Sequence, residues 1–326
     1  MTRVGIVGCG NVTTGLHLPL LLNIKGVEVV YAADIDRRAE AAQSYGVKWL
    51  TIGKDISNLP DCDVLLLAIP VGVREAYIRE FGSRNTSIFS EKTFALSTDQ
   101  HKRFLQLAKK MGCNYARITQ SATRQLARLI QFGPFGRLLH VSMSEGGIVG
   151  ATGKSKNHYQ TSPELSGGGI LIELGCHPIS QLAFLFDGYE FSVERAEIQK
   201  VGGIDVDVEA RLVASKGGDS VPIDFRLSMV RPLEIKSRFV FENAEVVFDH
   251  RNPDGKVQIS GKWQGQFTLE PDRSWALTIR QEFYLKWKNF LSSVQEENAF
   301  DAQSPSETSL ATTKMIADIY GRAANG

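Results

Sequence analysis

The sequence lacks any apolar run long enough to cross a membrane. The longest, Val64–Val73, has about ten residues and contains a proline, whereas a transmembrane helix needs about 20 apolar residues. The N-terminus leads directly into the strand-like run Arg3–Val7, without the charged and apolar regions of a signal peptide. We therefore expect no membrane partner and a cytoplasmic location.

Paired cysteines and excess charge are also lacking. The four cysteines, Cys9, Cys62, Cys113 and Cys176, show no C-x-x-C spacing, which disfavours both a zinc site and a disulfide framework. We predict no bound metal. Lys and Arg number 37 against 36 Asp and Glu, a formal net charge of +1. Because nucleic acids and acidic membrane surfaces select proteins with a basic excess, we predict no nucleic-acid partner.

The sequence does contain enough material for two domains. It has 326 residues, of which 43% are hydrophobic, and a domain takes about 150 residues. Residues 1–118 alternate short apolar strands with helical runs, which predicts βαβ units and an α/β Rossmann domain. The predicted strands are Arg3–Val7, Val27–Ala33, Val64–Ile69, Thr86–Ser90 and Asn114–Ala116, and the predicted helices are Val12–Ile24, Arg37–Tyr45, Arg74–Phe81 and Thr98–Met111.

Residues 119–326 have a different pattern. One apolar helical run, Ile170–Phe186, precedes a series of strand-like segments between residues 191 and 269, with no helical segment among them. Two helices, near Ser274–Val294 and Ser306–Ala323, close the chain. Strands that follow one another without crossover helices pair antiparallel. We therefore predict an α+β domain with a large, mostly antiparallel open sheet, whose C-terminal helix can pack back on the first domain.

A glycine-rich turn follows the first strand and opens a helix, in the order G-x-G-x-x-T. Gly8 allows the tight turn and Gly10 allows the backbone to approach a pyrophosphate. Asn11 and Val12 begin the helix, whose N-terminal amides attract phosphate. Thr13 stands where a third glycine commonly packs the helix on the strand. We predict that Gly8, Gly10, Asn11 and Val12 bind a dinucleotide cofactor.

Asp34 at the end of the second strand bears on which dinucleotide is bound. A carboxylate there accepts hydrogen bonds from the ribose hydroxyls of NAD and repels the 2′-phosphate of NADP. Arg37 and Arg38 follow it, and either could hold that phosphate or lie in solvent. The sequence therefore favours NAD and leaves NADP open, with all three residues as candidate cofactor contacts.

Three further segments complete a pattern together with the glycine-rich turn. Ala68–Pro70 ends the third strand, Phe89–Thr93 ends the fourth, and Gly167–His177 opens the first helix of the second domain. With this order and spacing, nearly the whole chain resembles the Gfo/Idh/MocA oxidoreductases. The resemblance implies a Rossmann domain followed by an antiparallel sheet, a nicotinamide cofactor, and a sugar, nucleotide sugar or cyclitol as substrate. Ile69, Pro70, Glu91 and Lys92 become candidate cofactor contacts.

The resemblance also implies the catalytic residues. The family's Glu-Lys-Pro motif falls on Glu91, Lys92 and Thr93, and the acidic residue and histidine of its helix motif fall on Glu173 and His177. Thr93 replaces proline, Glu173 replaces aspartate, and Ser180 stands where a second acidic residue is common. The proline often shapes the backbone around the lysine, so Thr93 implies a different presentation of Lys92, whereas the changes at 173 and 180 bear on how the proton is handled.

The chemistry of these side chains fits such a role. A lysine ammonium such as that of Lys92 can stabilise developing alkoxide charge. Glu173 and His177, four residues apart on a helix, would share one face, so the carboxylate could orient the imidazole as a general base. Either Lys92 or His177 could carry the proton. The alternatives, an ordinary surface lysine and an ordinary helix-surface Glu–His pair, stay open.

Substrate contacts and assembly are less directly indicated. Arg117 follows the last Rossmann strand, and Tyr159 lies in a polar stretch before Gly167; with Lys92, Glu173 and His177 they are candidate substrate contacts. An open sheet with an uncovered apolar face needs a partner, which predicts a homodimer or homotetramer.

We thus predict an NAD(P)-dependent oxidoreductase that transfers a hydride between nicotinamide and a secondary alcohol or ketone of a sugar-like molecule. Two alternatives stay open. One is a redox-neutral, NAD-dependent sugar-processing enzyme. The other is a nucleotide-binding regulator that has lost catalysis, which the substitutions at positions 93, 173 and 180 motivate.

Overall fold

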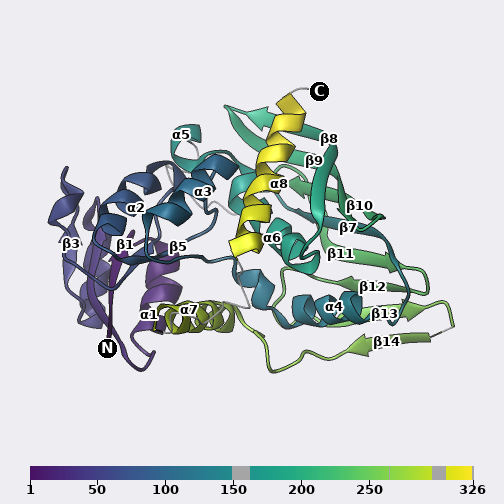
Figure 1. Cartoon of the computed structure of the whole chain (residues 1–326), viewed down its shortest axis with the longest axis horizontal. Coiled ribbons are helices and arrows are strands. Elements are labelled where there is room, and N and C mark those ends of the chain that lie inside the picture. Colours follow the sequence, from purple (N-terminus) through teal and green to yellow (C-terminus); the bar gives the residue numbers. More distant parts are fainter. Residues whose placement is uncertain (149–161, 264, 296–305, 325–326) are drawn as a thin grey trace. The chain divides into compact units, whose positions relative to one another are not determined.

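The computed structural model describes residues 1–148, 162–263, 265–295 and 306–324. The chain forms two compact units, each built from two separate segments (Figure 1). The first comprises Met1–Asn114 and Phe283–Pro305, and the second comprises Tyr115–Glu282 and Ser306–Gly326. Each unit has its own sheet, so each is described in turn.

The first unit contains a six-stranded parallel sheet with strand order β3-β2-β1-β4-β5-β6, which confirms the Rossmann prediction. β4 is buried throughout, as expected for a parallel strand covered on both faces. The strands are β1 (Thr2–Val7), β2 (Val27–Asp34), β3 (Trp49–Thr51), β4 (Val64–Leu67), β5 (Ser87–Ser90) and β6 (Met111–Cys113). The helices are η1 (Thr13–His17), α1 (Leu18–Leu21), η2 (Arg37–Tyr45), η3 (Ile56–Asn58), η4 (Val71–Val73), α2 (Arg74–Ser83), α3 (Thr98–Leu107) and most of α7 (Ile279–Gln295).

Several local predictions in this unit were wrong in detail. The last strand is Met111–Cys113 and not Asn114–Ala116. Gly112 lies at its centre, where a Cβ would lie 2.6 Å from Phe290 Cδ2. Glycine weakens the strand signal in a sequence. The predicted helix at 12–24 begins with the π-helical turn η1, and the one at 37–45 is a 3₁₀-helix. Strand β3, at the sheet edge, was not predicted.

The core of the first unit includes residues from the far end of the chain. Trp287, Phe290 and Leu291 of α7 are buried together with Val4 and Phe89 of the parallel sheet. The Phe89 and Trp287 rings lie 4.3 Å apart between centroids. The segment from residue 283 is therefore part of this unit's hydrophobic core, and its aromatic side chains pack against β5.

The second unit contains an eight-stranded sheet with strand order β14-β13-β12-β11-β7-β10-β9-β8. Every pair is antiparallel except β7 with β10, which confirms the prediction of a mostly antiparallel sheet. The strands are β7 (Leu138–Gly146), β8 (Glu190–Val201), β9 (Ile204–Lys216), β10 (Asp219–Ser228), β11 (Leu233–Phe241), β12 (Ala244–Phe248), β13 (Val257–Gly261) and β14 (Gly265–Leu269). The helices are η5 (Ala116–Thr119), α4 (Ser121–Phe132), α5 (Pro163–Ser166), η7 (Leu171–Gly175), α6 (Cys176–Leu185) and α8 (Ser306–Ala324). Helix α4 and strand β7 were not predicted.

The two faces of this sheet differ in character. Along β9, the buried residues Val208, Ala210 and Leu212 alternate with the partly exposed Asp207, Glu209 and Arg211. The apolar face packs under helices, as where Gly175 of η7 lies against Leu227 of β10. The polar face is covered with ion pairs, among them Arg231–Asp207, Arg231–Glu209, Arg211–Asp224, His140–Asp224 and Arg238–Glu245.

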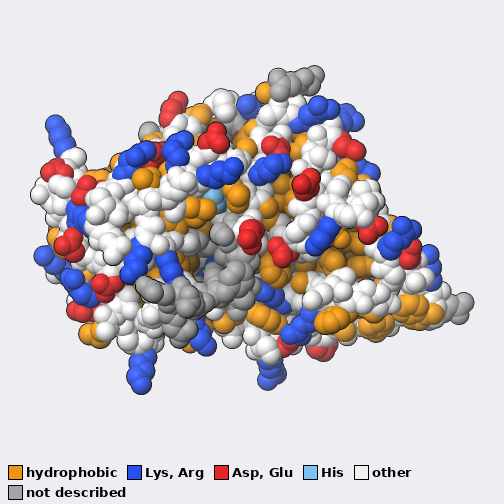
Figure 2. All heavy atoms as spheres, in the orientation of Figure 1, with side chains coloured by type: hydrophobic (Ala, Val, Ile, Leu, Met, Phe, Trp, Pro, Cys, Tyr) orange, Lys and Arg blue, Asp and Glu red, His pale blue; other side chains and the backbone are white. Residues whose placement is uncertain are grey.

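The expectation of an uncovered apolar sheet face was therefore wrong for the described residues. Side chains of opposite sign occupy neighbouring strands there and pair with one another, so burial against a partner is not needed to hide apolar surface. Figure 2 shows one face of the molecule, on which Lys, Arg, Asp and Glu side chains are interspersed and hydrophobic side chains gather toward the lower right. The homodimer or homotetramer stays a prediction, but an uncovered apolar sheet face no longer supports it.

One helical stretch, Pro163–Leu185, is long and apolar enough by composition to cross a membrane, but 72% of its apolar 18-residue window is buried inside the structure. Burial of this kind is typical of a core helix. Its apolar residues, including Leu171, Ile179 and Leu182, are accounted for by packing within the second unit.

The triple glycine before this helix is required by close packing. A Cβ on Gly168 would lie 2.3 Å from the Tyr320 hydroxyl, and a Cβ on Gly169 would lie 2.1 Å from the Asp205 carbonyl oxygen. The Asp205 carboxylate, which is buried, accepts hydrogen bonds from the Gly169 and Leu171 amides at 2.5 and 2.8 Å and from the Tyr320 hydroxyl at 2.7 Å. It thereby satisfies backbone donors at the helix start that have no intrahelical partner.

We expect Gly169→Ala to lower the thermal stability of the second unit by about 1–3 kcal/mol, because the added methyl must displace strand backbone. Gly321→Ala is the matched control: a Cβ there meets nothing within 4 Å, and alanine is favoured over glycine in a helix by about 1 kcal/mol. Thermal unfolding followed by circular dichroism measures both. Equal melting temperatures for the two variants would contradict the packing argument.

Candidate nucleotide and catalytic sites

The glycine-rich turn after β1 has the geometry of a phosphate-binding loop. Gly8 has a φ of +95°, and a Cβ there would lie 2.3 Å from the Ala68 carbonyl oxygen, so only glycine fits. A Cβ on Gly10 would meet no described atom within 4 Å, so the backbone is open to a ligand at this point. Asn11 and Val12 follow in the first helical turn, whose amides lack intrahelical acceptors. The loop thus fits the pyrophosphate of a dinucleotide.

Thr13, which stands in place of the third glycine, connects the first helix to the glycine-rich loop. Its side chain is buried, and its hydroxyl donates a hydrogen bond to the Gly8 carbonyl oxygen at 2.7 Å. The π-helical turn η1 begins at this residue, and such a turn is wider than an α-helical turn. The hydroxyl therefore ties the helix to the loop where the usual glycine would allow close packing.

Asp34 lies at the carboxyl end of β2, beside the loop. Its Oδ2 accepts a hydrogen bond from the Cys9 amide at 2.7 Å, and its Oδ1 accepts one from the Ile35 amide at 2.8 Å. Carboxylate oxygens have further lone pairs, so both atoms can still accept from ribose hydroxyls. Arg37 and Arg38 belong to η2, but their side chains lie outside the described part of the structure.

The loops after β4 and β5 are held together by Arg74, a residue that the sequence did not single out. Its guanidinium is buried and donates to the carbonyl oxygens of Ile69 at 2.8 Å and Thr93 at 2.5 Å. Pro70 adjoins the first contact, and the Lys92–Thr93 peptide bond is cis. Arg74 therefore fixes the backbone on the C-terminal side of Lys92, whose own side chain is partly exposed.

The Glu91 carboxylate is buried in a network of its own unit. Its Oε1 accepts hydrogen bonds from His17 Nε2 at 2.8 Å and Asn114 Nδ2 at 2.7 Å, and its Oε2 accepts one from the Lys92 amide at 3.2 Å. Burial by itself would raise the pKa of Glu91, but the hydrogen bonds from His17 and Asn114 and the nearby Lys92 charge lower this pKa below its ordinary value. Contact of Glu91 with a cofactor stays a prediction, and its role in the structure is to hold the turn that carries Lys92.

In the second unit, Glu173 and His177 lie where the helix changes type. Glu173 is exposed in the π-helical turn η7, and His177 is partly buried in the first turn of α6. Pro178 also falls in that first turn, where proline is tolerated. The buried Ser180 hydroxyl donates to the His177 carbonyl oxygen at 2.7 Å, so this residue, which replaces an acidic one, serves the helix backbone.

Arg117 belongs to a buried ion network instead of standing free. Its Nη1 and Nη2 donate to Glu145 Oε2 and Oε1 at 2.7 and 3.2 Å, and His250 Nε2 lies 3.3 Å from Oε2. Burial would raise the pKa of Glu145, but the hydrogen bonds and charges of His250 and Arg117 lower it to about 2. A substrate or cofactor contact of Arg117 stays a prediction, because its charge is already matched.

Two further predictions concern Tyr159 and the binding of a metal ion. Tyr159, a candidate substrate contact, lies outside the described residues. Among the residues that are described, no group of three or more His, Cys, Asp or Glu side chains could hold a metal ion. Cys9, Cys62, Cys113 and Cys176 are all buried, and none of these four forms a disulfide.

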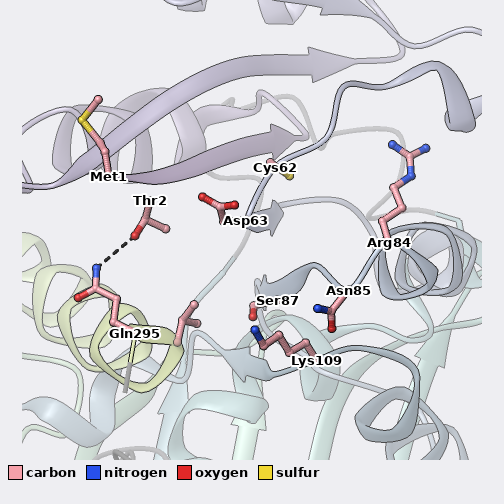
Figure 3. A pocket seen from close by; sticks show the side chains of 10 residues that line it. Met1, Thr2, Cys62, Asp63, Arg84, Asn85, Ser87, Lys109 and Gln295 are labelled. Atoms are coloured by element: carbon pink, nitrogen blue, oxygen red, sulfur yellow. Dashed lines mark hydrogen bonds between the residues drawn. The ribbon is translucent and has the colours of Figure 1, made fainter. Parts of the chain in front are cut away.

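The first unit also contains a pocket of about 590 Å³ on another edge of its sheet (Figure 3). It is lined by Thr2, Asp63 and Ser87, which stand at the amino ends of β1, β4 and β5, and Gln295 donates to the Thr2 hydroxyl at 3.1 Å. Ligands of doubly wound sheets bind at the carboxyl ends of the strands. This pocket therefore lies at the opposite edge from the Gly8–Gly10 loop.

Comparison with known proteins agrees with this geometry. A family model described as an oxidoreductase family with an NAD-binding Rossmann fold matches residues 2–118, and the Gfo/Idh/MocA C-terminal domain matches residues 123–239. The fold and loop define a two-domain, nucleotide-binding oxidoreductase. The chain belongs to the Gfo/Idh/MocA family.

Individual relatives are distant. A curated dTDP-3,4-didehydro-2,6-dideoxy-α-D-glucose 3-reductase from Saccharopolyspora spinosa is 24% identical over 182 residues, 54% of this chain and 53% of that protein. The chain thus matches about half the length of this relative.

Solved structures show the same fold over the whole chain. A 3-ketoreductase from Actinomadura kijaniata with NADP and TDP-benzene has a TM-score of 0.82 at 18% identity, covering 98% of this chain and 97% of that one. An aldose–aldose oxidoreductase from Caulobacter crescentus with glycerol has a TM-score of 0.83 at 14% identity, covering 100% and 98%. A levoglucosan dehydrogenase with NADH and levoglucosan has a TM-score of 0.81 at 16% identity, covering 99% and 97%.

The Glu145 network makes stability depend on pH. Because the pKa of Glu145 is about 2 in the folded protein against an ordinary 4.5, its contribution is present above about pH 4.5 and is lost as the pH falls toward 2. Its size is about 3 kcal/mol. Glu145→Gln, which leaves the Arg117 charge unpaired, should cost about 3–5 kcal/mol at pH 7.

We therefore expect the difference in melting temperature between wild type and Glu145→Gln to shrink steadily between pH 5 and pH 2.5. Glu190→Gln, at an exposed carboxylate of the same unit, controls for the change in net charge. A difference that stays constant across this pH range would show that Glu145 is not ionised in the folded protein.

Proposed function

We propose that this protein is a nicotinamide-dependent oxidoreductase that interconverts a secondary alcohol and a ketone on a sugar or nucleotide sugar. The observation that carries the proposal is the placement of Lys92. It follows β5, which lies two strands from β1 in the sheet, so its backbone is about 10 Å from the Gly8–Gly10 loop at ~4.8 Å per strand. A lysine on backbone at that distance is suited to bring its ammonium group to a substrate oxygen at the reactive end of a dinucleotide.

The cofactor that we propose is NAD, with NADP as the alternative. Gly8, Gly10, Asn11 and Val12 would hold the pyrophosphate, and Asp34 would accept hydrogen bonds from the adenosine ribose. The Asp34 carboxylate is fixed by the Cys9 and Ile35 amides, so it cannot turn away easily from a 2′-phosphate and would repel it. Ile69 and Pro70, on the loop after β4, are further candidate contacts with the cofactor.

The nicotinamide ring, when bound, supplies or accepts the hydride. The chain's own residues bind the substrate and handle the proton. Lys92 would donate a hydrogen bond to the carbonyl oxygen during reduction and stabilise the charge that develops on it. His177 is the alternative proton carrier, with Glu173 one turn earlier to orient it. Lys92 and His177 belong to different units. Because either side chain could carry the proton, separate substitutions are needed to identify the carrier.

The substrate class rests on the relatives. The curated relative is named for a dTDP-sugar, the Actinomadura kijaniata structure holds TDP-benzene, and the levoglucosan dehydrogenase holds an anhydrosugar. We propose a molecule of this kind, and Tyr159 and Arg117 remain candidates for contacting it.

We expect Lys92→Ala to lower kcat by about 10²–10⁴-fold, the usual contribution of a positioned proton donor, while the Kd for NADH changes less than threefold. Assays follow nicotinamide absorbance with dTDP-ketosugars, ketosugars and polyols, and NADH binding is titrated by fluorescence. Lys102→Ala, at an exposed lysine of α3, is the control. His177→Ala is tested alongside. Of these two variants, the one that lacks the proton-carrying side chain should lose a titration from the kcat–pH profile, which identifies the carrier.

Wild-type protein that binds NADH but turns over no member of the substrate panel would contradict the proposed activity. Lys92→Ala with wild-type kcat would contradict the assignment of Lys92 alone.

Cofactor choice is tested separately at Asp34. Asp34→Asn removes the negative charge but keeps an oxygen that can accept from the Cys9 amide. We expect the ratio of NADPH to NADH affinity to rise at least tenfold, because the repulsion of the 2′-phosphate is lost. An unchanged ratio in calorimetric titrations of both cofactors would show that Asp34 does not face the ribose.

A further inference from the structure

A buried chain of hydrogen bonds in the first unit leads from helix α7 to the turn that carries Lys92. The Trp287 indole Nε1 donates to His17 Nδ1 at 2.8 Å. His17 Nε2 contacts Glu91 Oε1 at 2.8 Å, and Glu91 Oε2 accepts the Lys92 amide at 3.2 Å. Trp287 and His17 are 270 residues apart in the sequence, so the chain of hydrogen bonds exists only in the folded unit.

The direction of each hydrogen bond in this chain is fixed by chemistry. An indole N–H can only donate, so His17 Nδ1 must accept and carries no proton. The imidazole proton is then on Nε2, where it points to the Glu91 carboxylate. The Glu91 carboxylate, which can only accept, requires the same tautomer, and Trp287 supplies the donor that the unprotonated Nδ1 needs.

The surroundings leave few other partners for these groups. His17 and Trp287 are both fully buried. The His17 ring is surrounded by aromatic rings, with the centroids of Phe283 at 4.9 Å, Trp287 at 5.9 Å and Phe89 at 6.3 Å. In such a site a polar network is stabilising only when each member is satisfied, so removal of the indole donor should disturb the members that follow it.

We propose that Trp287 and His17 are positioning residues for Lys92, acting through the Glu91 carboxylate. This inference rests on the proposed function of Lys92. Glu91 holds the Lys92 backbone at its amide, and Arg74 holds it one residue later at the Thr93 carbonyl oxygen. The lysine side chain thus extends from a backbone that is anchored on both sides. A shift of about 1 Å at such a position can lower the rate of catalysis up to a hundredfold.

Trp287→Phe tests the proposal, because it keeps the aromatic packing and removes the one N–H. We expect kcat to fall about ten- to hundredfold, while KM and the Kd for NADH stay within threefold. ¹⁵N NMR of the histidine side chains should show an unprotonated, hydrogen-bonded Nδ1 of His17 in wild type and a shifted Nδ1 resonance in Trp287→Phe. Phe290→Leu is the matched control, since it changes the same helix and contacts Phe89 but removes no hydrogen bond.

A second pair of variants guards against a folding defect. His17→Gln keeps one donor and one acceptor at the centre of the network and should retain more kcat than His17→Leu, which keeps neither. Wild-type kcat in Trp287→Phe, or an equal loss in Phe290→Leu, would overturn the proposal, as would equal kcat in the two His17 variants. If wild type itself turns over no substrate, the proposed function fails; an unchanged His17 Nδ1 resonance in Trp287→Phe overturns the positioning network independently.

Discussion

The approach of two strand-end loops is the constraint on which the first unit depends. Gly8 lies so close to the Ala68 carbonyl oxygen that a side chain cannot be added, and this contact brings the loop after β1 against the loop after β4. Arg74 then joins the β4 loop to the β5 loop through the Ile69 and Thr93 carbonyl oxygens. The three loops that a dinucleotide-binding sheet presents at its carboxyl edge are therefore fixed relative to one another, two of them by close backbone packing and two by the Arg74 side chain.

The parts of this edge that could be predicted from sequence are those with a local pattern. The glycines, Asp34 and the Glu91–Lys92 pair each stand at a fixed offset from an apolar strand, so periodicity and motif spacing locate them. Arg74 could not be found in this way, because an arginine in the first turn of a helix gives no sign that it is buried. The same is true of Trp287, whose partner His17 lies at the other end of the chain.

The sheet of the second unit shows a different limit of sequence reasoning. Alternation of apolar and polar residues correctly predicts strands, and it also predicts one buried face. It cannot show what the polar residues do, because Asp207 and Glu209 meet Arg231 only after the strands are placed side by side. The assumption of an uncovered apolar face failed for this reason: the charges of neighbouring strands satisfy one another, and that register is a property of the assembled sheet.

The same physical device supports the candidate catalytic segment of each unit. In the first, the buried Glu91 carboxylate accepts the Lys92 amide; in the second, the buried Asp205 carboxylate accepts the amides that open the helix leading to His177. A buried carboxylate with several donors is rigid, because breaking one bond leaves charge unsatisfied in a low-dielectric site. Thr93 and Ser180 depart from the family pattern. The Thr93 carbonyl oxygen nevertheless accepts a hydrogen bond from Arg74, and the Ser180 hydroxyl donates one to the His177 carbonyl oxygen. The departures therefore alter side chains around the anchored segments and leave the anchors themselves in place.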